Sequence, residues 1–158
     1  LGVYSCDAAL YDVEHRTSTI CYEYICPQIP SAKGLTLKID DWPDIYEQLL
    51  QGHYVQYCFI GLPGALVRSS KLEFTILSCP LVDDRGVLGD MWLFKPRTEY
   101  FSDLEIRLVQ QVANQCAIAI RQARLYQATQ AQVEELEKLN RLKDDFLSTV
   151  SHELRTPM

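Results

Sequence analysis

The feature that most constrains this chain is the absence of proline and glycine from residues 97–156. A helix start lies near the beginning of this stretch. Ser102 and Glu105 have the spacing of a capping box, and Phe101 and Ile106 have the spacing of a hydrophobic staple. One helix from there onward would be about 80 Å long at roughly 1.5 Å per residue. We therefore predict a helix that is far too long to lie on the domain that precedes it.

The apolar pattern divides this helix into two parts. Residues 104–123 carry apolar side chains on several faces, which predicts packing on a sheet and on a partner. From residue 125 the apolar side chains form a single stripe among charged residues. The stripe consists of Tyr126, Val133, Leu136, Leu139, Leu142, Phe146 and Val150. A narrow stripe on a protruding helix predicts a coiled coil, here a parallel homodimer.

The spacing of this stripe leaves two interpretations open. From Val133 to Leu142 the apolar residues recur at every third position, without the usual alternation of three and four. Such a stutter allows a coiled coil to change its pitch, which would suit a signalling helix. The simpler interpretation is a slightly imperfect dimer seam.

The residues before this helix alternate short β-like runs with turns. Asp41 can cap a short helix that Pro43 begins and Gly52 ends. The turn 83–86 ends in glycine and joins two strong strands as a hairpin. The predicted strands are 3–11, 17–25, 34–39, 54–60, 72–82 and 87–95, with a loop or short helix at 61–70. This order of elements predicts an α+β domain.

Composition excludes several classes of function. The formal net charge is −6 and the basic residues are scattered, which excludes a nucleic-acid-binding surface. No apolar run reaches the roughly 18 residues of a membrane span, and no secretory signal begins the chain. We therefore expect a cytoplasmic protein. The chain ends at Met158 inside a recognisable motif, so we expect it to be a fragment of a longer protein.

Six cysteines are scattered through the chain, and none forms a C-x-x-C pair. The closest two are Cys21 and Cys26. Without a secretory signal we expect free, buried thiols rather than disulfides. A metal or iron–sulfur site would need tighter spacing or clustered histidines, whereas His15, His53 and His152 lie far apart. We therefore expect no metal site.

Residues 146–157 carry the motif with the clearest chemistry, F-L-S-T-V-S-H-E-L-R-T-P. It resembles the H-box of the commonest class of bacterial histidine kinases and contains the central S-H-E-L-R-T-P in full. A lone helical histidine is usually a surface residue, but His152 has every neighbour that the family pattern expects. An imidazole offers a nucleophilic nitrogen near physiological pH without a strong base. Phe146, Val150 and Leu154 share one helix face, and His152 lies away from it.

The resemblance implies a role for each polar residue of the motif. His152 would accept the γ-phosphoryl group of ATP on Nε2, and Glu153 would orient or deprotonate the imidazole. Thr156 would assist dephosphorylation of a partner response regulator, and Pro157 would bend the helix. The full-length protein would be a sensor histidine kinase whose separate kinase domain uses ATP and Mg²⁺. This chain has neither a G-x-x-x-x-G-K nor a G-x-G-x-x-G loop, so we expect it to hold no cofactor and to be inactive alone.

Two stretches before residue 146 resemble a GAF domain. One is a helix led by tryptophan at 42–52. The other is a strand–turn–strand at 78–89 that continues to an aromatic residue and an acidic helix cap at 101–105. The resemblance extends over residues 1–126 and implies an antiparallel sheet flanked by helices. A PAS domain has a related architecture and is the alternative. The chain then divides into a GAF-like sensor domain (1–125), a coiled-coil signalling linker (126–144) and the start of a phosphoacceptor domain (145–158).

GAF domains bind many small molecules or none, and the resemblance leaves the ligand open. The N-K-x-n-F-x-x-x-D-E pattern of cyclic-nucleotide-binding members is absent, and no cysteine is followed by histidine as in bilin-binding members. Four aromatic side chains could line a cavity or form ordinary core: Tyr22, Tyr24, Tyr57 and Phe59. Cys58 lies between two of them and is the thiol to test first, with an ordinary core cysteine as the alternative.

Three functions therefore stand as hypotheses. The first is a dimeric GAF sensor whose ligand state shifts the exit helix and the accessibility of His152. The second is a ligand-free module for dimerisation and transmission. The third is a redox sensor that uses one of the thiols. The expected partners are a second copy of the chain, a response regulator and a small-molecule ligand, and nucleic acid is not expected.

Overall fold

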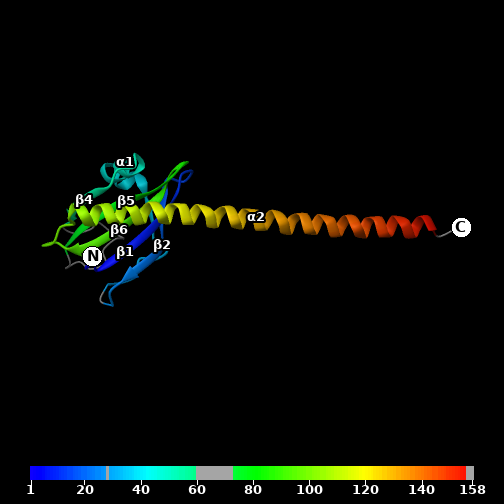
Figure 1. The fold of residues 1–158 in the computed structure, drawn as a ribbon, viewed down its shortest axis with the longest axis horizontal. Coiled ribbons are helices and arrows are strands. Elements are labelled where there is room, and N and C mark those ends of the chain that lie inside the picture. The colour runs from blue at the N-terminus through cyan, green and yellow to red at the C-terminus, as the bar shows by residue number, and fades with distance from the viewer. Residues whose placement is uncertain (28, 60–72, 156–158) are drawn as a thin grey trace. The chain divides into compact units, whose positions relative to one another are not determined.

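The computed structural model describes residues 1–27, 29–59 and 73–155, the side chain of Phe59 excepted. The N-terminal part is a six-stranded sheet in the order β3-β2-β1-β6-β5-β4, and every neighbouring pair is antiparallel (Figure 1). The strands are β1 Ser5–Asp12, β2 Thr17–Ile25, β3 Thr36–Lys38, β4 Val55–Phe59, β5 Phe74–Asp83 and β6 Gly86–Pro96. The helices are the 3-10 turn η1 Ile39–Asp41, α1 Pro43–Leu50 and α2 Asp103–Arg155. The predicted α+β class, with an antiparallel sheet and a long C-terminal helix, is confirmed.

The two faces of the sheet bury different residues, because successive side chains of a strand point to opposite faces. On one face, Tyr46 and Leu49 of α1 pack in a core with Phe94 of β6. Lys95 alternates with Phe94 and bonds Glu105 of α2, so α2 begins on the opposite face. The buried residues of α2 recur at helical spacing: Ile106, Val109, Ala113 and Ala117. We refer below to the α1 face and the α2 face of the sheet.

The β5–β6 hairpin forms where the sequence predicts it. Oδ1 of Asp83 accepts hydrogen bonds from the backbone N–H groups of Arg85 at 2.8 Å and Gly86 at 3.1 Å. Gly86 has a φ of +133°, which glycine adopts without strain. Further along β6, a Cβ atom on Gly89 would lie 2.0 Å from the carbonyl oxygen of Ala9. The pairing of β6 with β1 therefore requires glycine at this position.

A β-bulge changes the side chains that β2 presents to each face. Ala9 of β1 pairs with Ile20, whereas the preceding Ala8 pairs with Tyr22, so Cys21 is an extra residue on β2. Ile20 shares the α1 face with Ala9. From Tyr22 onward the alternation is inverted, and side chains that simple alternation would place beside Ile20 point to the α2 face.

Some local details differ from the predicted elements. The strand predicted at 34–39 is shorter, because the chain turns into η1 at Ile39, whose N–H donates to the carbonyl oxygen of Arg16 at 3.0 Å. The prediction that Asp41 caps α1 is wrong: Trp42 holds the cap position and no side chain caps the helix. The loop or helix predicted at 61–70 lies outside the described residues.

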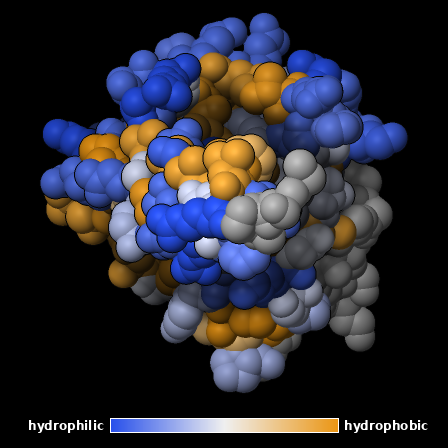
Figure 2. Space-filling model, turned by 90° about the vertical axis from the view of Figure 1, so that its right-hand side faces the viewer, coloured by the Kyte–Doolittle hydropathy of each residue, from blue (hydrophilic) through white to orange (hydrophobic). Residues whose placement is uncertain are grey.

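The chain separates into two compact units, residues 1–118 and residues 119–158. The first unit holds the sheet, α1 and the first turns of α2. In the second unit, α2 continues to Arg155, and every residue from Gln122 to Arg155 is exposed. Figure 2 shows hydrophobic residues, in orange, beside hydrophilic ones, in blue, on one face of the molecule. The functional limits at residues 125 and 144 stay predictions.

Candidate functional site

A small cavity lies between the sheet and α1. Strands β1, β2, β3 and β6 and helix α1 form its walls: Asp7, Ala9, Ser18, Ile20, Leu37, Tyr46, Asp90 and Trp92. The space that a water-sized group can occupy is about 10 Å³, which is room for about one water molecule. Carboxyl and hydroxyl groups therefore share a small space with apolar side chains.

Asp90 is the most unusual residue of this cavity because its side chain is fully buried, at 0% exposed. The Tyr11 hydroxyl donates a hydrogen bond to its Oδ2 at 2.6 Å. Its Oδ1 has no hydrogen-bond partner among the residues that the structure describes. Burial raises the pKa of this carboxyl group to about 7, although the side chains of Tyr11 and Trp92 oppose the rise. The group therefore changes between its acid and ionised forms near neutral pH.

Aromatic side chains surround this carboxyl group on the α1 face. The ring centroids of Tyr11 and Tyr46 lie 5.7 Å apart. Those of Tyr46 and Trp92 are separated by 6.5 Å, and those of Tyr57 and Trp92 by 6.4 Å. Burial, and then the nearby carboxyl group, raise the pKa of the phenols of Tyr11 and Tyr46 above its usual range. These phenols therefore stay protonated at physiological pH.

The residues predicted to line a pocket fall on different faces of the sheet. Tyr57 packs against the core on the α1 face. Tyr22 and Tyr24 lie beyond the β-bulge and are 60% and 65% exposed. Cys58 points to the α2 face, and the side chain of Phe59 lies outside the described part. The structure thus does not gather these residues at one cavity, and their role in binding stays a prediction.

Sequence interpretation missed Asp90, although a signal was present. It stands in the otherwise apolar run 87–94 of β6. A charged residue inside such a strand is rare unless it is paired or functional. Tyr11 carries no comparable signal, because its contact with Asp90 depends on the pairing of β1 with β6.

All six cysteines are free, as predicted, but Cys79 is the one that is fully buried. Burial raises the pKa of the Cys6 thiol to about 11 and that of Cys79 to about 12. Cys58 differs because it is exposed. Its Sγ lies 3.5 Å from both Thr75 Oγ1 and the Tyr100 hydroxyl oxygen, and these hydrogen bonds lower its pKa. Cys58 therefore has the environment closest to that of a reactive thiol.

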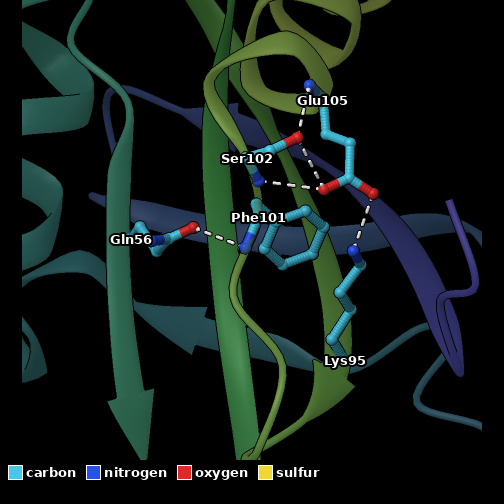
Figure 3. Close-up of polar contacts among 5 residues, drawn as sticks. All are labelled: Gln56, Lys95, Phe101, Ser102 and Glu105. Carbon is cyan, nitrogen blue, oxygen red and sulfur yellow. Dashed lines mark hydrogen bonds and ion pairs between the residues drawn. The ribbon is translucent and has the colours of Figure 1, made fainter.

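The start of α2 is held by a capping box, as the sequence predicts (Figure 3). The N–H of Ser102 donates to Oε2 of Glu105 at 2.9 Å, and the N–H of Glu105 donates to Oγ of Ser102 at 3.4 Å. Nζ of Lys95, on β6, donates to Oε1 of Glu105 at 2.7 Å. Oε1 of Gln56, on β4, accepts a hydrogen bond from the N–H of Phe101 at 3.1 Å. Side chains of two strands thus fix the first turn of α2 to the sheet.

The ion pair in this junction is shielded from water. The side chain of Lys95 is 6% exposed and that of Glu105 is 24% exposed. Nζ of Lys95 also lies 4.7 Å from the centroid of the Phe101 ring. The hydrogen bond from Lys95, followed by those from Ser102, lowers the pKa of Glu105 to about 2. Glu105 therefore stays ionised at physiological pH. It lies in the first turn of α2, and a helix N-terminus favours negative charge.

The residues of the predicted H-box lie at the C-terminal end of α2. His152 and Glu153 are exposed residues of this helix, whereas Thr156 and Pro157 lie outside the described residues. The apolar stripe is exposed as well: Val133 43%, Leu136 66%, Leu139 55%, Leu142 57%, Phe146 67% and Val150 36%. The predicted coiled coil through this stripe stays a prediction.

The described residues include neither a membrane-spanning helix nor a cluster of metal-binding side chains. No helix in them is long and apolar enough to cross a membrane. The same residues contain no group of three or more histidine, cysteine, aspartate or glutamate side chains that could hold a metal ion.

The sequence of this chain matches a known domain family and two histidine kinases. The GAF domain family model matches residues 16–120. Hybrid signal transduction histidine kinase G of Dictyostelium discoideum is 35% identical over 92 residues, which are 53% of this chain and 3% of that protein. Circadian input-output histidine kinase CikA of Thermosynechococcus vestitus is 27% identical over 162 aligned residues, which cover 83% of this chain and 22% of that protein. The chain thus spans less than a quarter of either relative.

Solved structures agree with the fold. The GAF domain/HD domain protein from Geobacter sulfurreducens superposes with a TM-score of 0.63 at 17% identity, over 80% of this chain and 85% of that one. The blue-light-absorbing form of the Thermosynechococcus elongatus PixJ GAF domain gives a TM-score of 0.62 at 15% identity, over 84% and 83% of the two chains. At such identities the likeness concerns the fold alone.

Proposed function

Because the chain belongs to the GAF domain family, we propose that its N-terminal unit senses a small ligand or signal and thereby controls phosphorylation of His152. The protein is then part of a two-component histidine kinase that passes its phosphoryl group to a response regulator. Two histidine kinases among its relatives support this context. The observation that carries the proposal is α2, a single helix that begins at the capping box on the sheet and includes His152.

His152 supplies the nucleophile in this proposal. Its Nε2 attacks the γ-phosphorus of ATP, an N–P bond forms as the bond to the β-phosphate oxygen breaks, and ADP leaves. Glu153 orients the ring or takes the proton from its other nitrogen. Thr156 assists the later dephosphorylation of the response regulator. A separate kinase domain supplies the ATP and Mg²⁺.

Phosphate labelling tests this assignment. With an isolated histidine-kinase catalytic domain added in trans, the chain should incorporate the γ-phosphoryl group of ATP as an acid-labile label. His152→Gln should reduce the label to background, because glutamine offers no nucleophilic ring nitrogen. His15→Gln changes another exposed histidine and should keep the label. Label that persists in His152→Gln would contradict the assignment.

The exposed stripe on α2 leads us to propose a second copy of this chain as its partner. Two parallel helices would cover the apolar residues from Val133 to Val150 and place both His152 side chains at the same end. Light scattering at micromolar concentration should give twice the monomer mass of 18.1 kDa. Leu139→Lys should shift the protein toward monomer, whereas Glu137→Lys, off the stripe, should not. A monomer in the unmodified chain would contradict the proposal.

Thiol-based redox sensing is a second candidate function, and the exposed Cys58 with its lowered pKa favours it. This function predicts that peroxide changes His152 labelling and that Cys58→Ser removes the change. A peroxide response that survives in Cys58→Ser would dismiss this thiol as the sensor.

A further inference from the structure

We propose that the cavity between the sheet and α1 binds a small ammonium-type cation, either ammonium itself or the –NH₃⁺ head of a short primary amine, on the carboxyl group of Asp90. The inference rests on the proposed sensing function, because it names the class of ligand that this same domain would sense.

The cavity contains a buried carboxylate oxygen that needs a hydrogen-bond donor. Oδ1 of Asp90 is fully buried and forms no hydrogen bond of normal geometry in the described part of the chain, although the Trp92 side chain lies near enough to the carboxyl group to oppose part of the rise in its pKa. Oδ2 already accepts a hydrogen bond from Tyr11. The hydroxyl oxygens of Ser18 and Tyr46, each 1% exposed, also have no hydrogen-bond partner in the described part of the chain. The two hydroxyl groups lie near enough to each other for Ser18 to offset part of the rise in the pKa of Tyr46, but they form no hydrogen bond of normal geometry. The two hydroxyl groups can donate or accept, whereas the ionised carboxylate oxygen Oδ1 only accepts. An occupant with several N–H groups could donate to all three oxygen atoms, and an acceptor-only ligand would leave Oδ1 unsatisfied.

Charge and aromatic faces favour a cation over a neutral donor. Asp90 forms no ion pair with a described lysine, arginine or histidine. Asp7 lines the same cavity and its negative charge adds to the field at Asp90. The rings of Tyr46 and Trp92 complete the wall, and aromatic faces attract ammonium groups. A buried carboxylate without a cation is costly, so a cation of the right size would stabilise the folded state.

The size of the cavity narrows the class of cation. A space of about 10 Å³ holds one group the size of water or ammonium. A quaternary ammonium head is larger and has no N–H group, so it cannot replace the missing donors. A divalent metal ion would seek more carboxylate ligands than the described residues of this wall supply.

The proposed cation should bind more tightly as pH rises. The titratable groups that face Asp90 are Asp7 and Tyr11 of β1, Tyr46 of α1 and Tyr57 of β4. Burial raises the pKa of Asp90 to about 7, and the ammonium ion binds the ionised carboxylate. Between pH 6 and pH 8 the ionised fraction, and with it the affinity, should increase about tenfold.

Thermal unfolding and calorimetry of the full chain with simple salts test the proposal. At constant ionic strength and pH 8, ammonium and methylammonium chloride should raise the melting temperature, whereas potassium and tetramethylammonium chloride should not. Asp90→Asn should abolish this response and Tyr46→Phe should weaken it. Asp41→Asn, which changes an exposed aspartate elsewhere, should leave it intact.

Two results would overturn the proposal. One is an equal response to potassium and ammonium, or no response to either, which would indicate a general salt effect or a bound water molecule. The other is an unchanged ammonium response in Asp90→Asn. Labelling of His152, measured on the same preparations, distinguishes a failure of the proposed ligand class from a failure of the phosphoacceptor role. Label without ammonium binding would dismiss the ligand class alone, and ammonium binding without label would dismiss the phosphoacceptor role alone.

Discussion

Replacing Asp90 with asparagine is expected to raise the free energy of unfolding at pH 8, in the absence of ammonium salts, by up to about 4 kcal/mol. Burial raises the pKa of this carboxyl group from 3.8 to about 7, so at pH 8 the folded state holds a buried negative charge. Asparagine removes the charge and keeps an oxygen that accepts the hydrogen bond of Tyr11. Ser18 and Tyr46 line the same cavity and offer hydroxyl oxygens as acceptors for the new amide N–H group.

The pH dependence of this effect is its signature. Between about pH 4 and pH 7 the folded protein keeps a proton at Asp90 that the unfolded chain releases. The free energy of unfolding of the unmodified chain therefore falls as pH rises through this range and is constant above it, as far as this group is concerned. The free energy of unfolding of Asp90→Asn, relative to that of the unmodified chain, should therefore increase by roughly 3 kcal/mol between pH 5 and pH 8.

Urea unfolding followed by circular dichroism at pH 5, 6, 7 and 8 measures this difference. Asp41→Asn, which changes an exposed aspartate, serves as the matched control and should show a difference that does not vary in this way. If Asp90→Asn were less stable than the unmodified chain at pH 8, the buried charge would be compensated in the folded state, and our description of the cavity would be incorrect.

Replacing Glu105 with glutamine is expected to lower the free energy of unfolding by roughly 2–4 kcal/mol. The ammonium group of Lys95 is 6% exposed and would lose its opposite charge, which lies 2.7 Å away. Glutamine at this position still completes a capping box with Ser102. The loss should therefore report the buried charge rather than the helix cap.

A double variant separates these contributions. Lys95→Met keeps most of the apolar stem and removes the ammonium group, so Lys95→Met/Glu105→Gln should recover most of the stability that Glu105→Gln loses. Glu99→Gln, at an exposed position just before α2, should change little. Equal losses in the single and double variants would show that the ion pair contributes nothing beyond the cap.

The same ion pair has a defined pH range. The pKa of Glu105 is lowered from 4.5 to about 2. Its contribution to stability is therefore complete above about pH 4.5 and is lost as pH falls toward 2. The unmodified chain should lose this contribution under acid conditions, whereas Glu105→Gln has none to lose.

Several features could be predicted from the sequence because they depend on residues close together in the chain. The capping box joins positions three residues apart, and the hydrogen bonds of Ser102 and Glu105 form as predicted. The β5–β6 turn likewise needs only Asp83 and Gly86. Local hydrogen bonds and backbone preferences depend on neighbouring residues and not on tertiary packing, so their patterns can be recognised in the sequence.

The cavity, in contrast, was decided by the tertiary structure. The contact of Tyr11 with Asp90 joins residues 79 positions apart and exists because β1 pairs with β6. The face on which Tyr22 lies depends on one extra residue in β2, and simple alternation cannot reveal a bulge that arises from pairing with β1. The sequence alone therefore determined the family and the long helix, and it predicts the histidine motif. Strand pairing and register decided which polar groups were buried together, because burial depends on what covers each face of the sheet.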